Sequence, residues 1–347
     1  MNKIISAILL PFVFGGVAVA NEPTPEAYEL IMNSVQDDAK TRKSLRGDGL
    51  TAITVDGLLQ TGWSYSNGGG ADALYGFDVY RARLGLKGRL GKDASFRLNG
   101  EWTPGSEFEL LEAFVDYRGF DFADVRVGQF VSTFYSGFVA NPADLTTQTY
   151  SITAQTFGQG YGQGIELSRS FGEVEFSAFY NNGFDNLTGV SNGDYAAGFH
   201  AGYDVCEGFS VGGGYAYIEG PAQYMSYTLD TTVTLDEFSL NAAWISDDRM
   251  DGWENYSLVT TASFNLSDQS QLFGQYEYGN LGGFAGGKLN VGTIGLNYDL
   301  TRGVKWTNSV GYAFDDIAAG FDTANTGWNA GAGQGEYVVR SFITISF

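Results

Sequence analysis

The chain has 347 residues, of which 49 are Gly and 15% are aromatic, whereas only 17% are charged and 6 are Pro. A formal charge of -21 excludes a nucleic-acid partner, because phosphates require a basic face, and the single Cys excludes a disulfide framework and a multi-thiolate metal site. After residue 20 no apolar run reaches the roughly 20 residues of a membrane-spanning helix, and the many aromatic residues exclude disorder.

Residues 1–20 have the pattern of a secretory signal peptide. Lys3 gives the positive start, a mostly apolar stretch follows, and Ala18 and Ala20 form the small-x-small cleavage pattern. The pattern predicts export from the cytoplasm, and the alternative is an uncleaved membrane anchor.

Residues 21–48 are predicted to form a periplasmic helix. Thr24 is suited to the N-cap and Pro25 to the first helical position, and the glycines from Gly47 onward end the segment. A solvated helix, a short oligomeric coil and an arm that tethers the protein to peptidoglycan are the alternatives for its role.

From residue 51 to residue 347 apolar and polar residues alternate. Around residues 77–90, Leu84 and Leu86 point to one side of the predicted strand, whereas Arg83 and Lys87 point to the other. Alternating segments with aromatic ends are the sequence pattern of a transmembrane β-barrel, and the alternative is a soluble β-sandwich. The final Phe347 resembles the C-terminal signal of bacterial outer-membrane barrels.

Tight polar turns give the expected number of strands. They occur near Lys92-Asp93, Gly119, Gly172-Glu173, Glu207-Gly208, Asp236-Glu237, Asp268-Gln269 and Arg302-Gly303. Longer loops lie between them, and seven turns with eight loops connect sixteen antiparallel strands. An even number of strands places both ends of the barrel domain, residues 51–347, at the turn end, which we expect to face the periplasm.

The third loop, residues 131–158, is far longer than a hairpin needs. Loops of this length are uncommon unless they are functional, and a barrel of this size encloses a water-filled channel. We therefore predict that the loop folds inward and narrows the lumen. Asp144 is its only charged residue, and Asn141 and Thr146 are among its polar residues.

Basic residues are predicted to gather on one wall of the lumen, because strand sixteen closes against strand one. They are Arg81, Arg83, Lys87, Arg89, Arg97, Arg126 and Arg340, and the same wall carries Glu101, Glu112 and Asp116. The wall attracts anions or orients dipolar solutes if these cations are uncompensated. Alternatively, the arginines pair with the nearby acids and stiffen the wall without selecting solutes.

Three stretches of this region resemble the phosphate-selective porin O and P family. They are Arg81-Ala-Arg-Leu-Gly-Leu-Lys-Gly88, Glu112-Ala-Phe-Val-Asp-Tyr117 and Val125-Arg-Val-Gly-Gln-Phe130, and the resemblance is specific over about residues 80–135. It implies an outer-membrane channel for small hydrophilic solutes or ions, commonly a homotrimer, with the third loop in the lumen. Family members usually follow Phe130 with lysine and then proline, where this chain has Val131 and Thr133. Because loop 131–158 also has no Lys or Arg, phosphate specificity is not implied.

Two other function classes remain open. His200, the only histidine, is predicted to face the lumen and could act as a base for a serine in a phospholipase-like barrel enzyme. No nucleophile elbow accompanies it, because the two Gly-x-Ser-x-Gly matches, at residues 189–193 and 208–212, lie in a predicted loop and at a predicted turn into a strand, and neither opens a helix. A structural barrel that tethers envelope layers is the third possibility. The channel hypothesis involves no catalytic step, no cofactor and no metal. Under this hypothesis the partners of the protein are outer-membrane lipid and small solutes.

Overall fold

The computed structural model describes residues 50–68, 73–102, 108–137, 142–158, 160–183, 193–220, 223–248, 255–282, 286–323, 326–328 and 333–347. The predicted signal peptide at 1–20 and the predicted helix at 21–48 lie outside these residues. Within them, no helix is long and apolar enough to span a bilayer.

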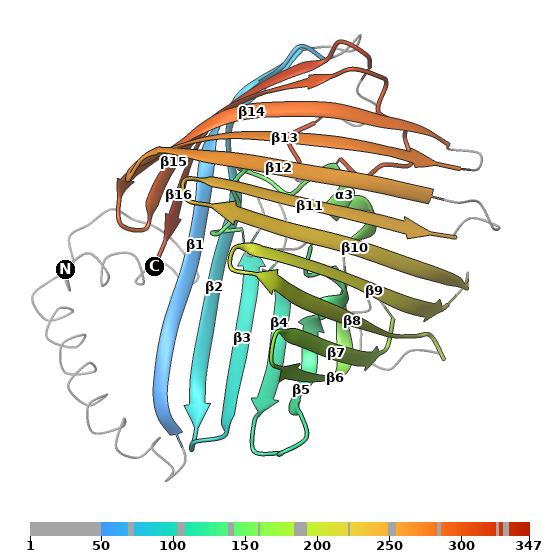
Figure 1. Ribbon diagram of the computed structural model, residues 1–347. Helices are drawn as coiled ribbons and strands as arrows, with labels where there is room; N and C mark the ends of the chain where they lie inside the picture. The colour runs from blue at the N-terminus through green and yellow to red at the C-terminus, as the bar shows by residue number, and fades with distance from the viewer. Residues whose placement is uncertain are drawn as a thin grey trace, which may run out of the picture. The chain divides into compact units, whose positions relative to one another are not determined.

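The described residues form a closed barrel of sixteen antiparallel strands (Figure 1). The strands are β1 (Leu50–Ser66), β2 (Leu74–Leu90), β3 (Ala94–Trp102), β4 (Phe108–Tyr117), β5 (Asp124–Val131), β6 (Tyr161–Phe171), β7 (Val174–Asn181), β8 (Tyr195–Cys206), β9 (Phe209–Glu219), β10 (Tyr224–Leu235), β11 (Phe238–Asp247), β12 (Asn255–Ser267), β13 (Ser270–Leu281), β14 (Gly287–Thr301), β15 (Val304–Ala313) and β16 (Tyr337–Ser346). Each strand pairs with its neighbours in sequence, and β16 closes the ring on β1, with Leu59 opposite Ile345. The predicted sixteen-stranded barrel is confirmed, and the sandwich alternative is excluded.

The predicted tight turns join the expected strand pairs at one end of the barrel. Gly208 in the β8–β9 turn has a φ of 76°, and Asp236 in the β10–β11 turn has a φ of 47°. Two-residue hairpin turns require positive φ because their twist must match that of the strands, which explains why Gly and Asp occupy these positions.

The two faces of the strands differ as the alternation predicts. On β14, Ile294 and Leu296 face outward and are 59% and 38% exposed. The next residue, Asn297, faces inward and is 5% exposed. Apolar side chains outside and polar side chains inside reverse the arrangement of a water-soluble barrel and match a barrel surrounded by lipid.

Segment 131–158 contains two short helices, η1 (Thr133–Tyr135) and α3 (Ile152–Phe157). Figure 1 shows α3 behind the strands β11 to β13, and its contacts are with β12 and β13. Both helices carry buried aromatic or aliphatic residues.

An apolar cluster joins this segment to the barrel wall. Its members from the segment are Phe134, Tyr135, Ile152, Ala154 and Phe157, and those from the wall include Phe179, Ile218, Ile245, Leu289 and Val291. Residues after β15, namely Ile317, Phe321 and Trp328, belong to the same cluster. The sequence pattern assigned only polar residues to the interior, so this packed apolar region is an addition from the structure.

Candidate functional site

A buried carboxylate of the barrel wall holds the start of segment 131–158. Glu166 on β6 accepts hydrogen bonds from the backbone N–H of Thr133 at 2.9 Å and from its hydroxyl at 3.0 Å. Thr133 begins η1, and the first N–H groups of a helix have no partner inside it. Glu166 supplies that partner and fixes the point at which the chain leaves β5.

A second buried carboxylate holds α3 in the same way. Glu277 on β13 accepts hydrogen bonds from the N–H groups of Ile152 at 3.2 Å and Thr153 at 2.8 Å, and from the Thr153 hydroxyl at 2.9 Å. Ser151 caps the same helix by accepting from the N–H of Ala154. The N–H groups of Ile152, Thr153 and Ala154 are therefore satisfied by two side chains, one of which belongs to the wall.

The stretch between the two helices is bonded to other strands. The amide of Gln60 on β1 donates to the Gln148 carbonyl at 2.6 Å, and Ser309 on β15 donates to the Gln148 side chain at 3.0 Å. Asn297 on β14 donates to the Thr146 carbonyl at 2.8 Å. One segment that contacts β6, β13, β14, β15 and β1 of a closed ring crosses the interior of that ring.

Glu101 on β3 pairs with two arginines of β2. The Nε of Arg83 donates to Glu101 at 2.6 Å, and an Nη of Arg81 is 3.9 Å from the same carboxylate. The Arg81 guanidinium also lies over the ring of Tyr150, 4.5 Å from its centroid, which links the wall to segment 131–158 by a cation–π contact.

Arg97 on β3 lies between two carboxylates. Its Nε donates to Glu112 at 2.5 Å, and one Nη is 3.1 Å from Asp56 on β1. Lys87 is also 3.1 Å from Asp56. The pairing of adjacent strands places Lys87 opposite Arg97, and Asp56 pairs with both of these cations.

Arg126 on β5 is held by Asp116 on β4. Two of its nitrogens donate to the two carboxylate oxygens at 2.8 and 3.3 Å, and a third nitrogen is 3.8 Å from Glu166. The guanidinium also stacks 4.3 Å from the centroid of the Phe114 ring.

These pairs form one charged surface, which we call the paired wall. It consists of the cations Arg81, Arg83, Lys87, Arg97 and Arg126 and the carboxylates Asp56, Glu101, Glu112, Asp116 and Glu166. The structure brings five of the seven predicted basic residues together. Arg89 is exposed at the turn end of β2, and Arg340 is buried on β16, 5.7 Å from the centroid of Trp328.

Asp56 is the member that the sequence reasoning missed. It has the same parity as Gln60 in the alternation of β1, and that parity would have identified it as an inward residue. Glu166 lies on β6, and its bond to segment 131–158 depends on a loop path that alternation does not contain.

A cavity of about 310 Å³ lies between segment 131–158 and the strands β10 to β13; we call it the loop cavity. Asp144, Thr146 and Tyr150 line it from the segment, and Asp230 and Gln275 are among its lining residues on the strands. Asp144 and Thr146, two of the three predicted loop residues, thus line the same cavity. The third, Asn141, lies outside the described residues.

His200 on β8 lies beside the loop cavity. Its Nε2 is 2.8 Å from a carboxylate oxygen of Asp230 and 3.3 Å from the hydroxyl of Ser136. Both neighbours therefore contact the same ring nitrogen. A Ser-His-Asp triad instead places serine at one ring nitrogen and the carboxylate at the other.

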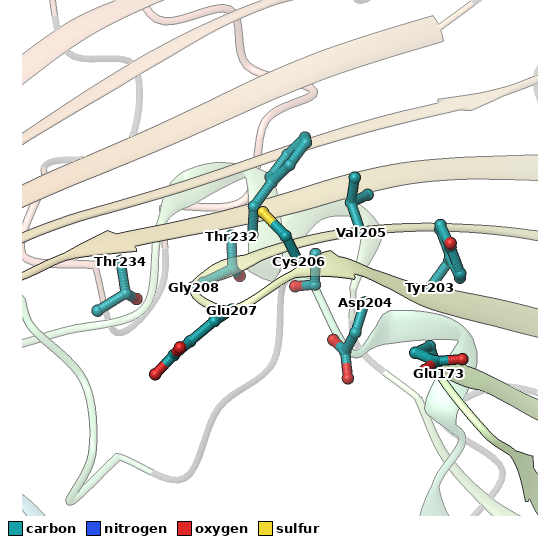
Figure 2. A pocket seen from close by; sticks show the side chains of 11 residues that line it. Glu173, Tyr203, Asp204, Val205, Cys206, Glu207, Gly208, Thr232 and Thr234 are labelled. Carbon is teal, nitrogen blue, oxygen red and sulfur yellow. The ribbon is translucent and has the colours of Figure 1, made fainter.

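A second cavity, of about 630 Å³, lies at the turn end of β8 and β9. Figure 2 shows the carboxyl groups of Asp204 and Glu207 beside this turn, with Glu173 from the neighbouring turn and the thiol of Cys206 close by. Across the part of the chain that the structure describes, no group of three or more His, Cys, Asp or Glu side chains is arranged to hold a metal ion.

Comparison with solved structures shows the same fold in several bacterial proteins. The anion-selective porin from Comamonas acidovorans is 21% identical, with a TM-score of 0.66 over 85% of this chain and 99% of that chain. OmpT of Vibrio cholerae, in its trimer form, is 11% identical, with a TM-score of 0.64 over 85% and 99%. Salmonella typhi OmpF in complex with daunomycin is 11% identical, with a TM-score of 0.65 over 85% and 97%. No curated protein sequence matches the chain significantly.

The family profile described as Gram-negative porin matches residues 7–334, which is most of the chain. This match confirms the porin resemblance of residues 80–135 and agrees with the closed barrel and its apolar exterior. The chain therefore belongs to the Gram-negative porin family and is a diffusion channel of the outer membrane.

Proposed function

We propose that the chain passes small hydrophilic solutes or ions passively and that segment 131–158 forms the constriction of the channel. The fixation of this segment by Glu166 on β6 and Glu277 on β13 carries the proposal. A sixteen-stranded barrel is wide enough for an aqueous channel. A segment bonded across it at two helix starts narrows that channel permanently, so it sets the size limit for solutes.

The paired wall favours the interpretation in which the basic residues pair with nearby acids and stiffen the wall without selecting solutes. Each of its cations lies within 4.0 Å of a carboxylate oxygen, as in Arg83 with Glu101 and Arg126 with Asp116. A compensated cation adds little to the long-range potential that attracts anions. We therefore assign the wall arginines a structural role, and an anion preference is not part of this proposal.

We propose no catalytic step. Ser136 and Asp230 compete for one nitrogen of His200, so the histidine cannot be oriented by the carboxylate while it accepts the serine proton. The phospholipase-like alternative has no support from this geometry.

We also propose that the protein is a homotrimer in outer-membrane lipid. The solved Vibrio cholerae OmpT of the same fold, described as a trimer form, supports this assembly, and the exposed apolar outer face supplies the lipid contact. The tethering alternative concerns residues 21–48. It predicts envelope defects without any change in permeability.

Purified protein added to a planar lipid bilayer is expected to give discrete conductance steps. In liposomes, swelling rates in neutral sugars are expected to fall steeply with sugar size, because the constriction is fixed. Insertion without conductance steps would contradict the proposed function, and swelling that does not depend on solute size would contradict the role of segment 131–158.

A further inference from the structure

The two charged side chains that line the loop cavity are both carboxylates. Asp144 lines it from segment 131–158 and Asp230 from β10, and none of its lining residues in the described part of the chain is Lys or Arg. The remaining lining side chains are mainly hydroxyl and amide groups, such as Thr146, Asn241 and Gln275. These groups can coordinate a passing ion in place of water, but they carry no net charge.

Asp144 is the more available of the two carboxylates. Its side chain is exposed on segment 131–158. Lys305 on β15 interacts electrostatically with both Asp144 and Asp299, and its ammonium donates a hydrogen bond to the Leu145 carbonyl at 2.7 Å. A single lysine opposite two carboxylates leaves negative charge at the cavity.

Asp230 is held in place more firmly. It pairs with His200, and its side chain is 22% exposed. Gly137 approaches it so closely that an added Cβ would lie 2.5 Å from the Asp230 Cβ. The segment therefore approaches Asp230 closely, with Asp144 lining the same cavity.

The opposite side of the interior does not offset these two charges. The paired wall has five cations and five carboxylates, and its formal charge is zero. Compensated pairs have short-range fields in water, where the Debye length is about 8 Å at physiological salt. The uncompensated charge beside segment 131–158 is thus negative.

We propose that the loop cavity is part of the conducting path and that Asp144 and Asp230 make the channel prefer cations and cationic solutes to anions. The inference rests on the proposed function, because selectivity presupposes conduction. It names the class of solute that the constriction favours, and it assigns Asp144 the larger share because Asp230 is paired with His200.

The test is the reversal potential of the wild-type channel in a planar bilayer with a tenfold KCl gradient. The wild type is expected to show cation preference. Asp144→Asn is expected to lower the cation-to-anion permeability ratio by about fivefold or more, because one unit charge at about 4 Å in water changes the partition of each ion about fivefold, in opposite directions. Asp230→Asn is expected to lower it less, and the double variant is expected to lower it most.

Asp268→Asn is the matched control, because Asp268 is an exposed carboxylate in the β12–β13 turn, outside the loop cavity. It should leave the ratio unchanged. Conductance steps with anion preference, or with a ratio that neither Asp144→Asn nor Asp230→Asn alters, would overturn the inference and leave the proposed function intact. Absence of steps in the wild type would overturn both.

Discussion

Segment 131–158 lies between two regions of barrel wall that are built differently. The β2–β6 region presents charged side chains that pair with one another, such as Arg97 with Glu112. The β11–β14 region presents Ile245, Leu289 and Val291, which are buried with residues of the segment. Ion pairs tolerate water, whereas apolar packing gains its free energy by excluding it. The loop is thus attached through a dry apolar contact on one side and faces a surface of paired charges on the other.

The largest effect is expected for Glu277→Ala on the dry side. It leaves two buried N–H groups of α3 without an acceptor, at a cost of about 1–3 kcal/mol each. Unfolding followed by circular dichroism should show a free-energy loss of about 4 kcal/mol, and released α3 should increase the single-channel conductance. Glu277→Gln keeps one carbonyl oxygen and should lose less. Equal losses in the two variants would show that the carboxylate does not hold the helix.

Ile152→Ala tests the apolar part of the same contact. Ile152 is fully buried, and truncation of a buried Ile costs about 3 kcal/mol through lost transfer energy and the cavity left behind. Leu300→Ala on the exposed outer face is the control and should cost less than about 1 kcal/mol. A comparable loss at both positions in thermal unfolding would argue against a dry core in the interior.

Arg83→Gln tests whether the paired wall is compensated. It leaves Glu101 with only the more distant Arg81, so we expect a loss of about 2 kcal/mol in stability and a shift of the reversal potential toward cations. The double variant Arg83→Gln, Glu101→Gln removes both charges and should restore the wild-type permeability ratio. A double variant that stays shifted would show that Arg83 acts on solutes independently of Glu101.

The smallest effect is expected for Lys87→Gln. The Lys87 side chain is 54% exposed although it pairs with Asp56, and exposed pairs contribute at most about 1 kcal/mol. The loss should shrink as salt is raised, because the pair is screened. A large loss of unfolding free energy that does not depend on salt would show instead that the Lys87–Asp56 pair is shielded from water.

The barrel itself could be predicted from the sequence because its determinants are local. Turn residues such as Gly208 and Asp236 need a particular φ, and alternation along each strand follows from backbone geometry alone. Glu112 and Asp116 could be placed on the same wall as the arginines because neighbouring strands have a defined order.

The path of segment 131–158 could not be predicted in the same way. Its contacts join residues that are far apart in sequence, as with Ile152 and Glu277 or Gln148 and Gln60. No periodicity records which wall residue a loop meets. The apolar interior around Ile245 was missed for the same reason, because an inward apolar residue is indistinguishable from an outward one until its partner is known.

The closure of the ring has a consequence for how the protein folds. Gly57 exchanges two backbone hydrogen bonds with Phe347, and β1 pairs with β16 from Leu58 to Ser66. This contact spans almost the whole chain, so β1 remains an unpaired edge until β16 is available. Unpaired edges invite association with other chains, and pairing over long sequence distances is slow. β1, the first strand in the chain, is therefore the last to complete its pairing.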